Sequence, residues 1–169
     1  FGHRNAVEAV RDITEGCGEL GIKYLTLYAF STENWGRPKA EIDGLMELLV
    51  NTLKQEIKRL TENQVRLITI GDTSHLPGDC QKNLEWAIDQ TKNNTGLTLV
   101  LALSYSGRWE IVKAVKTLAK EVLEGKVKID EINENVFTNY LQTSGIPDPE
   151  LLIRTSGEMR LSNFLLWQI

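Results

Sequence analysis

Three polar segments of this 169-residue sequence combine arginine with hydroxyl or amide side chains. They are residues 31–38, with Ser31, Asn34 and Arg37; residues 105–108; and residues 154–163, with Arg154, Glu158, Arg160 and Ser162. Guanidinium presents a planar fork of donors that grips phosphate oxygens in pairs and stays charged at any working pH. The set therefore predicts a phosphate or diphosphate ligand. For any one arginine alone, pairing with a surface carboxylate is the alternative.

Each polar segment follows a strand in a pattern that alternates helices and strands. Apolar spacing predicts helices over about 5–20 and 109–123 and near 136–141, with two more opened by Pro38 and Pro77. Strands are predicted at 23–30, 65–70, 97–103 and 151–153. This alternation indicates an α/β fold with a mainly parallel sheet flanked by helices. Ligands of such sheets bind at the carboxyl ends of the strands, so we expect the three segments on one rim.

Composition and missing motifs exclude several classes of function. The net charge of −4 lacks the basic excess of a nucleic-acid-binding protein. The sequence has no phosphate-loop, dinucleotide or hydrolase-elbow motif. Its two histidines, His3 and His75, argue against a multi-histidine metal site, and Cys17 and Cys80 form no pair motif, which fits a reducing compartment. No segment has the roughly 20 apolar residues of a membrane span.

Some individual residues have two interpretations at this point. His3, just before the first predicted helix, fits a cap or a packed surface histidine as well as a binding role. Trp35 in its polar loop either anchors that loop to the core or faces a substrate. The aliphatic stripe from Ile42 to Leu60 is core in any such fold, and its spacing does not by itself indicate a lipid tunnel.

Two long segments are more specific. Residues 28–38 (YAFSTENWGRP) and 152–168 (LIRTSGEMRLSNFLLWQ) resemble the signature segments of cis-prenyltransferases, the undecaprenyl diphosphate synthase family. Supporting segments are Gly2-His3, Ile70-Gly71-Asp72 and residues 105–111. The resemblance runs the whole length of the chain without an obvious insertion, and two long motifs in the right order are far more specific than a short pattern.

The resemblance implies a fold and a reaction. It implies a parallel sheet and helices around a hydrophobic tunnel, a homodimer, and magnesium as cofactor. Farnesyl diphosphate would ionise, isopentenyl diphosphate would attack, and loss of a proton would leave a cis double bond. The product would be a long polyprenyl diphosphate, the carrier lipid for cell-wall synthesis. The enzyme would be cytoplasmic, at the inner face of the membrane into which its product partitions, with no nucleic-acid partner.

The resemblance also assigns roles to the loop after the first strand. Ser31 and Asn34 match positions linked to handling the isopentenyl group and its proton, which makes them the expected catalytic residues. Trp35 would form a wall of that site. Arg37 resembles the arginine that holds the allylic diphosphate, and His3 matches a histidine placed beside it.

Further roles come from the last segment and the strands. Arg154, Arg160 and Ser162 match residues that hold the diphosphate of isopentenyl diphosphate. Two acids and two tunnel positions complete the implied site. They are Glu41, close to the site of Ser31 and Asn34 that Trp35 would wall, Glu158, bracing the arginines, and Ala29 and Leu97, along the tunnel.

The sequence also departs from the family pattern. We expect residues 1–169 to be a single cis-prenyltransferase domain that lacks the family's N-terminal aspartate loop and its C-terminal end. The family's metal-linked aspartate and glutamate would lie outside the chain, so we expect no metal ligand within it and little activity from the chain alone. Tyr105-Ser106-Gly107 also replaces a more usual Tyr-Gly-Gly.

Three alternatives are weighed against this prediction. A non-catalytic partner subunit of a heteromeric cis-prenyltransferase would share the fold, but such partners usually degrade the loop around Ser31 and Asn34, which is intact here. A generic anion-binding module would keep the arginines without needing Asn34 or Trp35. Trans-prenyltransferases are all-helical and carry DDxxD motifs, and neither feature occurs in this sequence.

Overall fold

A three-stranded sheet in the order β1-β3-β2 organises the first part of the chain. Its strands are β1 (Tyr24–Ser31), β2 (Arg66–Ile70) and β3 (Thr98–Tyr105). β2 runs parallel to β3, in a register from Arg66 opposite Thr98 to Ile70 opposite Ala102. The Thr98 N–H donates to the carbonyl of Lys23, so β1 and β3 also begin side by side. The predicted parallel sheet is therefore confirmed.

The computed structural model describes the backbone of residues 2–169 and the side chains of residues 7–169. Contacts divide the chain into two compact units, Phe1–Ser104 and Tyr105–Ile169. Within the described chain, none of the helices has the length and apolar character that a membrane span requires.

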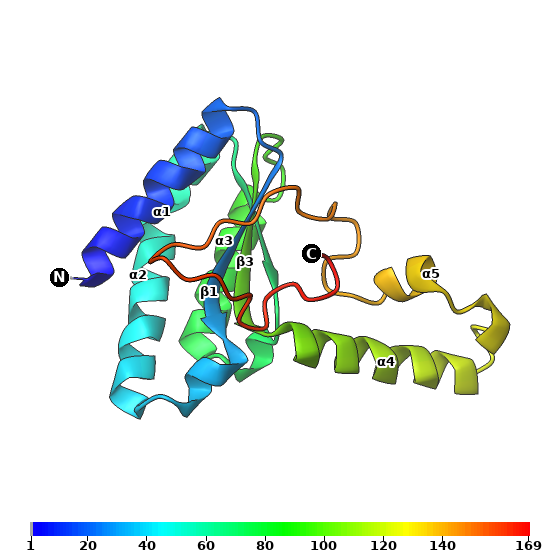
Figure 1. Cartoon of the computed structure of the whole chain (residues 1–169). Coiled ribbons are helices and arrows are strands. Elements are labelled where there is room, and N and C mark those ends of the chain that lie inside the picture. Colours follow the sequence, from blue (N-terminus) through cyan, green and yellow to red (C-terminus); the bar gives the residue numbers. More distant parts are fainter. Residues whose placement is uncertain (1) are drawn as a thin grey trace. The chain divides into compact units, whose positions relative to one another are not determined.

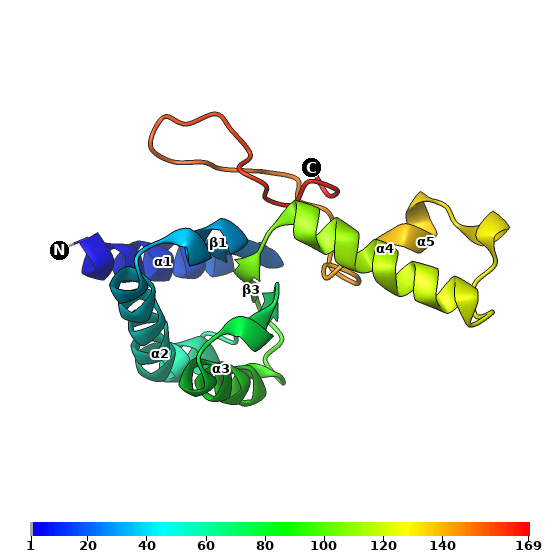
Figure 2. The ribbon, with the colours of Figure 1, turned by 90° about the horizontal axis from the view of Figure 1, so that it is seen from below.

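Three helices surround the sheet in the first unit. They are α1 (Gly2–Glu19), α2 (Lys39–Glu62) and α3 (Gly78–Thr91). Figures 1 and 2 show α2 and α3 side by side against the sheet, with α1 beside α2. Arg11 Nη2 lies 2.5 Å from Glu56 Oε1 and ties α1 to α2. Pro38 and Pro77 stand directly before α2 and α3, as predicted.

The core of this unit lies between the sheet and α2 and α3. Apolar side chains from all of these elements meet there, among them Met46, Leu53, Leu67, Leu84, Ala87, Leu99 and Leu101. Strand β3 is buried along almost its whole length, which is why its sequence reads as a nearly continuous apolar run. Burial on both faces fixes β3 firmly, so the residues at its carboxyl end are held in place.

At the β2 edge of the sheet, a side chain from α3 hydrogen-bonds to the strand backbone. The buried Thr91 hydroxyl accepts the Leu67 N–H at 3.0 Å and lies 3.0 Å from the carbonyl oxygen of Ala87, to which it donates. Leu67 lies on β2, an edge strand whose alternate N–H groups point away from β3. Thr91 therefore satisfies a backbone donor that the sheet leaves unpaired.

The second unit is built on α4 (Gly107–Leu123), followed by a short 3-10 helix (Ile129–Glu131) and α5 (Glu134–Thr138). Figure 1 shows α5 returning alongside α4. The Tyr140 hydroxyl donates to Glu121 Oε2 at 2.5 Å, which joins the residues after α5 to α4. Among the described residues after Asn139, none forms a further helix or strand.

The structure corrects two sequence predictions. Residues 151–153 are exposed coil rather than a strand, because their backbone forms no ladder with another strand in the described residues. The expected apolar stripe of α1 is only partly buried: Val10 and Ile13 are exposed, whereas Thr14 is buried and donates to the Val10 carbonyl. Cys17 is half-buried against the core, as a small packing residue.

Leu166 lies so close to the start of α4 that position 107 has no space for a side chain. A Cβ at this position would lie 2.8 Å from Cγ and 3.0 Å from the backbone nitrogen of Leu166. We expect Gly107→Ala to lower the free energy of unfolding by about 1–3 kcal/mol through overpacking. Gly44→Ala, inside α2 with nothing within 4 Å, is the matched control and should be neutral or stabilising by up to about 1 kcal/mol. Equal stability of the Gly107 variant and wild type in urea unfolding would contradict this account.

Candidate active site

The loop after β1 is a short 3-10 helix, η1 (Thr32–Gly36), that begins at the carboxyl end of the strand. The Ser31 N–H donates to Asn34 Oδ1 at 2.9 Å, so the two residues expected to be catalytic are brought together. This local bond holds the asparagine side chain across the start of the turn. Both residues are half-buried, so they remain accessible to a ligand.

Trp35 links this loop to the sheet. Its indole packs edge-on against Phe30, with ring centroids 5.0 Å apart, and its Nε1–H donates to Ser104 Oγ at 3.0 Å. The side chain is half-buried against the core. These contacts are those of a loop anchor, one of the two interpretations that the sequence allowed.

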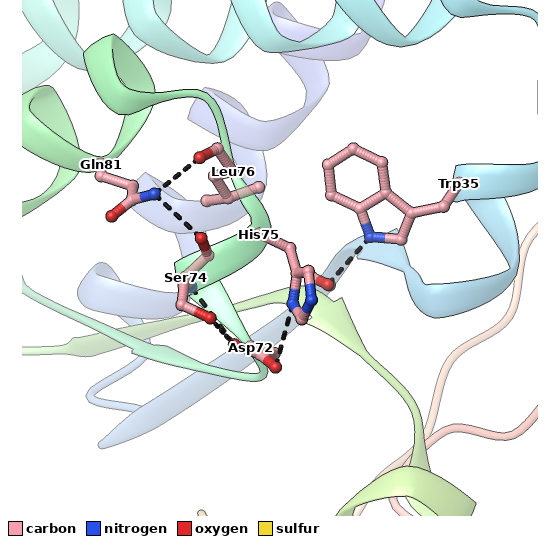
Figure 3. Close-up of polar contacts among 7 residues, drawn as sticks. Trp35, Asp72, Ser74, His75, Leu76 and Gln81 are labelled. Carbon is pink, nitrogen blue, oxygen red and sulfur yellow. Dashed lines mark hydrogen bonds and ion pairs between the residues drawn. The ribbon is translucent and has the colours of Figure 1, made fainter.

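A second loop at the same edge follows β2. Figure 3 shows Ser74 and His75 gathered on Asp72: Ser74 Oγ donates to Asp72 Oδ1 at 2.5 Å, and His75 Nδ1 lies 3.1 Å from Asp72 Oδ2. The Gln81 amide donates to the carbonyls of Ser74 and Leu76, which ties the loop to α3. The Asp72 N–H donates to the carbonyl of Ser104 at 3.1 Å.

Sequence reasoning did not assign a role to Ser104 or to Ser74. An aspartate two residues before a serine is the usual signal of a turn in which the carboxylate accepts the later N–H, and that signal is present at Asp72. Nothing local marks Ser104, because its importance comes from partners on two other loops.

Arg37 lies beyond η1 and is exposed. Its Nη1 is 2.6 Å from Oε1 of Glu41, in the first turn of α2, in an ion pair open to solvent. Glu41 also lines a shallow groove of about 350 Å³ with Ala40, Gly44, Glu47, Leu48 and Asn51. The expected allylic-diphosphate arginine therefore has a carboxylate partner in Glu41.

In the second unit, the expected isopentenyl diphosphate residues come together in one exposed loop. Arg154 Nη1 donates to the carbonyl of Arg160 at 2.6 Å and to Ser162 Oγ at 2.7 Å. Arg160 Nη2 lies 3.1 Å from Glu158 Oε1, so Glu158 does contact the arginine cluster. Residues 154–163, the Arg154 loop, are thereby folded around the Arg154 guanidinium.

Asn163 anchors the end of that loop to α4. Its Oδ1 accepts the Arg108 N–H at 2.9 Å and its carbonyl accepts the Gly107 N–H at 2.7 Å. Ser162 and Asn163 both have positive φ, 50° and 64°, which residues other than glycine rarely adopt. The chain therefore turns sharply here to bring Ser162 back towards Arg154.

The remaining predicted positions are more scattered. His3 falls in α1, but its side chain lies outside the described residues. Ala29 is exposed on β1, on the face that also carries Leu25 and Leu27. Leu97 is buried in the core just before β3.

Burial and charge act together on Tyr28, which precedes this loop on β1. Burial, followed by the negative charge of Glu33, raises the pKa of the Tyr28 phenol from 10.0 to about 12, against an opposing hydrogen bond with Ser31. Tyr28 therefore stays protonated at any working pH and keeps a neutral hydroxyl near Ser31.

No group of three or more His, Cys, Asp or Glu side chains is placed to hold a metal ion within the described part of the chain. The acids nearest the arginines, Glu41 and Glu158, are each engaged in an ion pair. These side chains do not make up a ligand set for magnesium.

A family model described as "Putative undecaprenyl diphosphate synthase" matches residues 1–169. The chain belongs to the undecaprenyl diphosphate synthase family. This confirms the resemblance drawn from residues 28–38 and 152–168. Both segments lie within the residues that the family model matches.

Named members of the undecaprenyl diphosphate synthase family resemble the chain over nearly its whole length. It is 54% identical to an isoprenyl transferase of Clostridium perfringens, over 99% of the chain and 66% of that protein. It is 50% identical to a ditrans,polycis-undecaprenyl-diphosphate synthase ((2E,6E)-farnesyl-diphosphate specific) of Pasteurella multocida, over 100% of the chain and 70% of that protein. The chain thus spans about two thirds of the length of these relatives.

A solved structure shares the fold. Lavandulyl diphosphate synthase from Lavandula x intermedia, in complex with dimethylallyl diphosphate, has a TM-score of 0.95 and 39% identity, covering 99% of this chain and 72% of that one.

The raised pKa of Tyr28 predicts a distinct alkaline titration. Because the folded-state pKa exceeds the unfolded value, stability is retained below pH 10 and falls as pH rises from about 10 to about 12. In absorbance titrations of phenolate, Tyr28→Phe should remove a component that ionises near pH 12, and Glu33→Gln should move it to lower pH. Tyr24→Phe, which removes a phenol elsewhere on β1, should keep that component. Its persistence in Tyr28→Phe would contradict the assignment.

Proposed function

We propose that this protein is a cis-prenyltransferase that condenses isopentenyl diphosphate with an allylic diphosphate, farnesyl diphosphate, to make a long polyprenyl diphosphate carrier lipid for cell-wall synthesis. Membership of the undecaprenyl diphosphate synthase family supports this proposal. The Pasteurella multocida relative, 50% identical, is named for farnesyl diphosphate and for the undecaprenyl product.

The Arg154 loop is the observation that carries the proposal. Two of the five guanidinium N–H groups of Arg154 are directed at Arg160 and Ser162, which fixes the plane of the guanidinium. The diphosphate of isopentenyl diphosphate binds to this preorganised fork, to Arg160 and to the Ser162 hydroxyl. Charge-assisted bonds of this kind are short and roughly twice as strong as neutral ones.

The loop after β1 handles the reacting groups. Arg37 binds the allylic diphosphate with His3 beside it, and exchanges its Glu41 partner for the substrate phosphate. As the allylic bond breaks, negative charge grows on the departing diphosphate, and a fixed cation stabilises it where it develops. Asn34 and Ser31 orient the isopentenyl group, and the proton that it loses passes by way of the Ser31 hydroxyl to an oxygen of the departing diphosphate, which has gained negative charge.

Apolar surface beside this loop binds the growing chain. Five apolar side chains of β1 and α2 are only half-buried against the core: Leu25, Leu27, Ile42, Leu45 and Leu49. Ala29 continues the β1 face that carries Leu25 and Leu27, and its small side chain leaves space at the end of the strand. Each buried methylene gains about 0.8 kcal/mol, so a prenyl tail favours such a surface over water. Leu97 contributes from the core side.

Magnesium is the expected cofactor, and when bound it would neutralise the diphosphates. The described acids do not form a ligand set for it. The protein acts as a homodimer in the cytoplasm, at the inner membrane face that receives its lipid product. Residues 1–169 belong to the catalytic domain, and the activity is that of the full-length gene product.

A non-catalytic partner subunit remains the second candidate. The loop that such partners degrade is intact here, with Ser31 and Asn34 hydrogen-bonded to one another. That contact favours an active subunit.

The decisive assay supplies the full-length gene product with farnesyl diphosphate, labelled isopentenyl diphosphate and magnesium. We expect a long extractable polyprenyl product that disappears when EDTA is added and returns with excess magnesium. The 169-residue chain alone should give little product. A folded full-length protein that makes no product would overturn the enzyme assignment and favour the partner subunit.

Arg154→Ala in the same full-length protein should raise KM for isopentenyl diphosphate by roughly 10- to 150-fold, the equivalent of a charge-assisted bond worth about 1.5–3 kcal/mol. KM for farnesyl diphosphate should change little. Arg59→Ala, which removes an exposed arginine paired with Glu15 on α1, is the matched control and should leave both constants unaltered. An unchanged KM for isopentenyl diphosphate in Arg154→Ala would remove Arg154 from the site.

A further inference from the structure

Ser104, near the end of β3, occupies a junction between two loops. Its hydroxyl accepts the Trp35 indole N–H, a contact between residues 69 positions apart, and its carbonyl accepts the Asp72 N–H. The residue is 2% exposed, so neither bond competes with water. The loops after β1 and β2 therefore share one fixed point at the carboxyl edge of the sheet.

The backbone of Ser104 is in a conformation that favours glycine. Its φ is +50°, in the left-handed region, at a position buried in the sheet. Glycine would adopt this φ without steric cost, yet it would lack the hydroxyl that Trp35 requires. Strain retained at a buried residue beside a candidate site is evidence for a role of its side chain.

The loop that carries Ser31 and Asn34 depends on this junction. None of the residues of η1 is buried, so the loop has little core packing of its own. Trp35 is its anchor, held by the edge contact with Phe30 and by the bond to Ser104. Rotation of the indole away from Ser104 would move the turn in which Asn34 is bonded to Ser31.

We infer that Ser104 is a positioning residue for the proposed prenyl transfer: through the Trp35 indole N–H it holds the Ser31–Gly36 loop in its reactive geometry. Ser104 acts through Trp35 and does not itself contact the reacting atoms. The inference rests on the proposed function for its kinetic consequences, whereas the hydrogen bond that it invokes is measurable without any substrate.

The first experiment tests the bond itself in the full-length protein. The indole N–H resonance of Trp35 is assigned by its loss in Trp35→Phe, and its exchange with solvent is followed by NMR. Ser104→Ala should shift this resonance upfield and speed its exchange, while the resonance of Trp86, an exposed tryptophan on α3, stays unchanged. Unaltered shift and exchange of Trp35 would overturn the inference, whatever the activity of the protein.

The second experiment separates positioning from a purely structural role. Ser104→Ala should lower kcat by about three- to tenfold, as expected for one lost hydrogen bond, with KM for both substrates within about twofold of wild type. Asn tolerates positive φ and offers an amide oxygen as acceptor, so Ser104→Asn should restore kcat. Ser104→Gly relieves the strained φ and should match or exceed wild-type thermal stability, yet show the same loss of kcat as Ser104→Ala.

A double-mutant cycle completes the test. Trp35→Phe keeps an aromatic ring but lacks the N–H, so adding Ser104→Ala to it should lower kcat no further. Trp86→Phe is the matched control and should leave kcat unaltered. Fully additive losses, or loss of activity that follows thermal stability across the Ser104 variants, would overturn the inference. If wild type itself makes no product, the proposed function fails, and the NMR result still decides whether Ser104 holds Trp35.

Discussion

The pairing of β3 between β1 and β2 is the constraint on which the first unit depends. The carboxyl ends of parallel strands point the same way, so the loops after β1 and β2 begin at one edge of the sheet. β3 is buried on both faces, and its position is set by apolar packing that no single polar contact could match. Ser104 is held by this strand, and Trp35 and Asp72 are held by Ser104. Precision at the candidate site therefore derives from the core.

A buried carboxylate has the corresponding role in the second unit. Glu110 is 1% exposed and accepts the Tyr105 hydroxyl, the Gln142 N–H and the Gln168 amide. A buried carboxylate is costly unless donors surround it, so these bonds oblige three separated parts of the chain to stay together. Asn163 caps the start of α4, where its side chain and carbonyl accept the Arg108 and Gly107 N–H groups. Residues 154–162 are thus exposed along their length but tied to α4 at their end through Asn163.

Sequence patterns predicted most of the helices and strands and part of the candidate site. The apolar run of β3 predicted a strand because a strand buried on both faces needs consecutive apolar residues. Pro38 and Pro77 predicted the starts of α2 and α3 because proline restricts the backbone in a way that suits the beginning of a helix. Residues 151–153 failed as a strand because a short apolar run does not show whether another strand is available to pair with it. Ser104 was missed for the opposite reason: its partners Trp35 and Asp72 are distant in the chain and only the fold reveals them.

The fold does not by itself determine the product. The lavandulyl diphosphate synthase solved in complex with dimethylallyl diphosphate has the same fold, with a TM-score of 0.95. A relative named for farnesyl diphosphate is 50% identical to this chain. What distinguishes such enzymes must then be side chains at fixed backbone positions. In this chain Ala29 is exposed at the end of the β1 face, while Leu97 is buried in the core. Under the proposed function, a change at Ala29 would alter the space open to an allylic tail without disturbing packing, whereas a change at Leu97 would first disturb the core. Under the proposed function, Ala29 is therefore a position at which primer choice could vary without a change of fold.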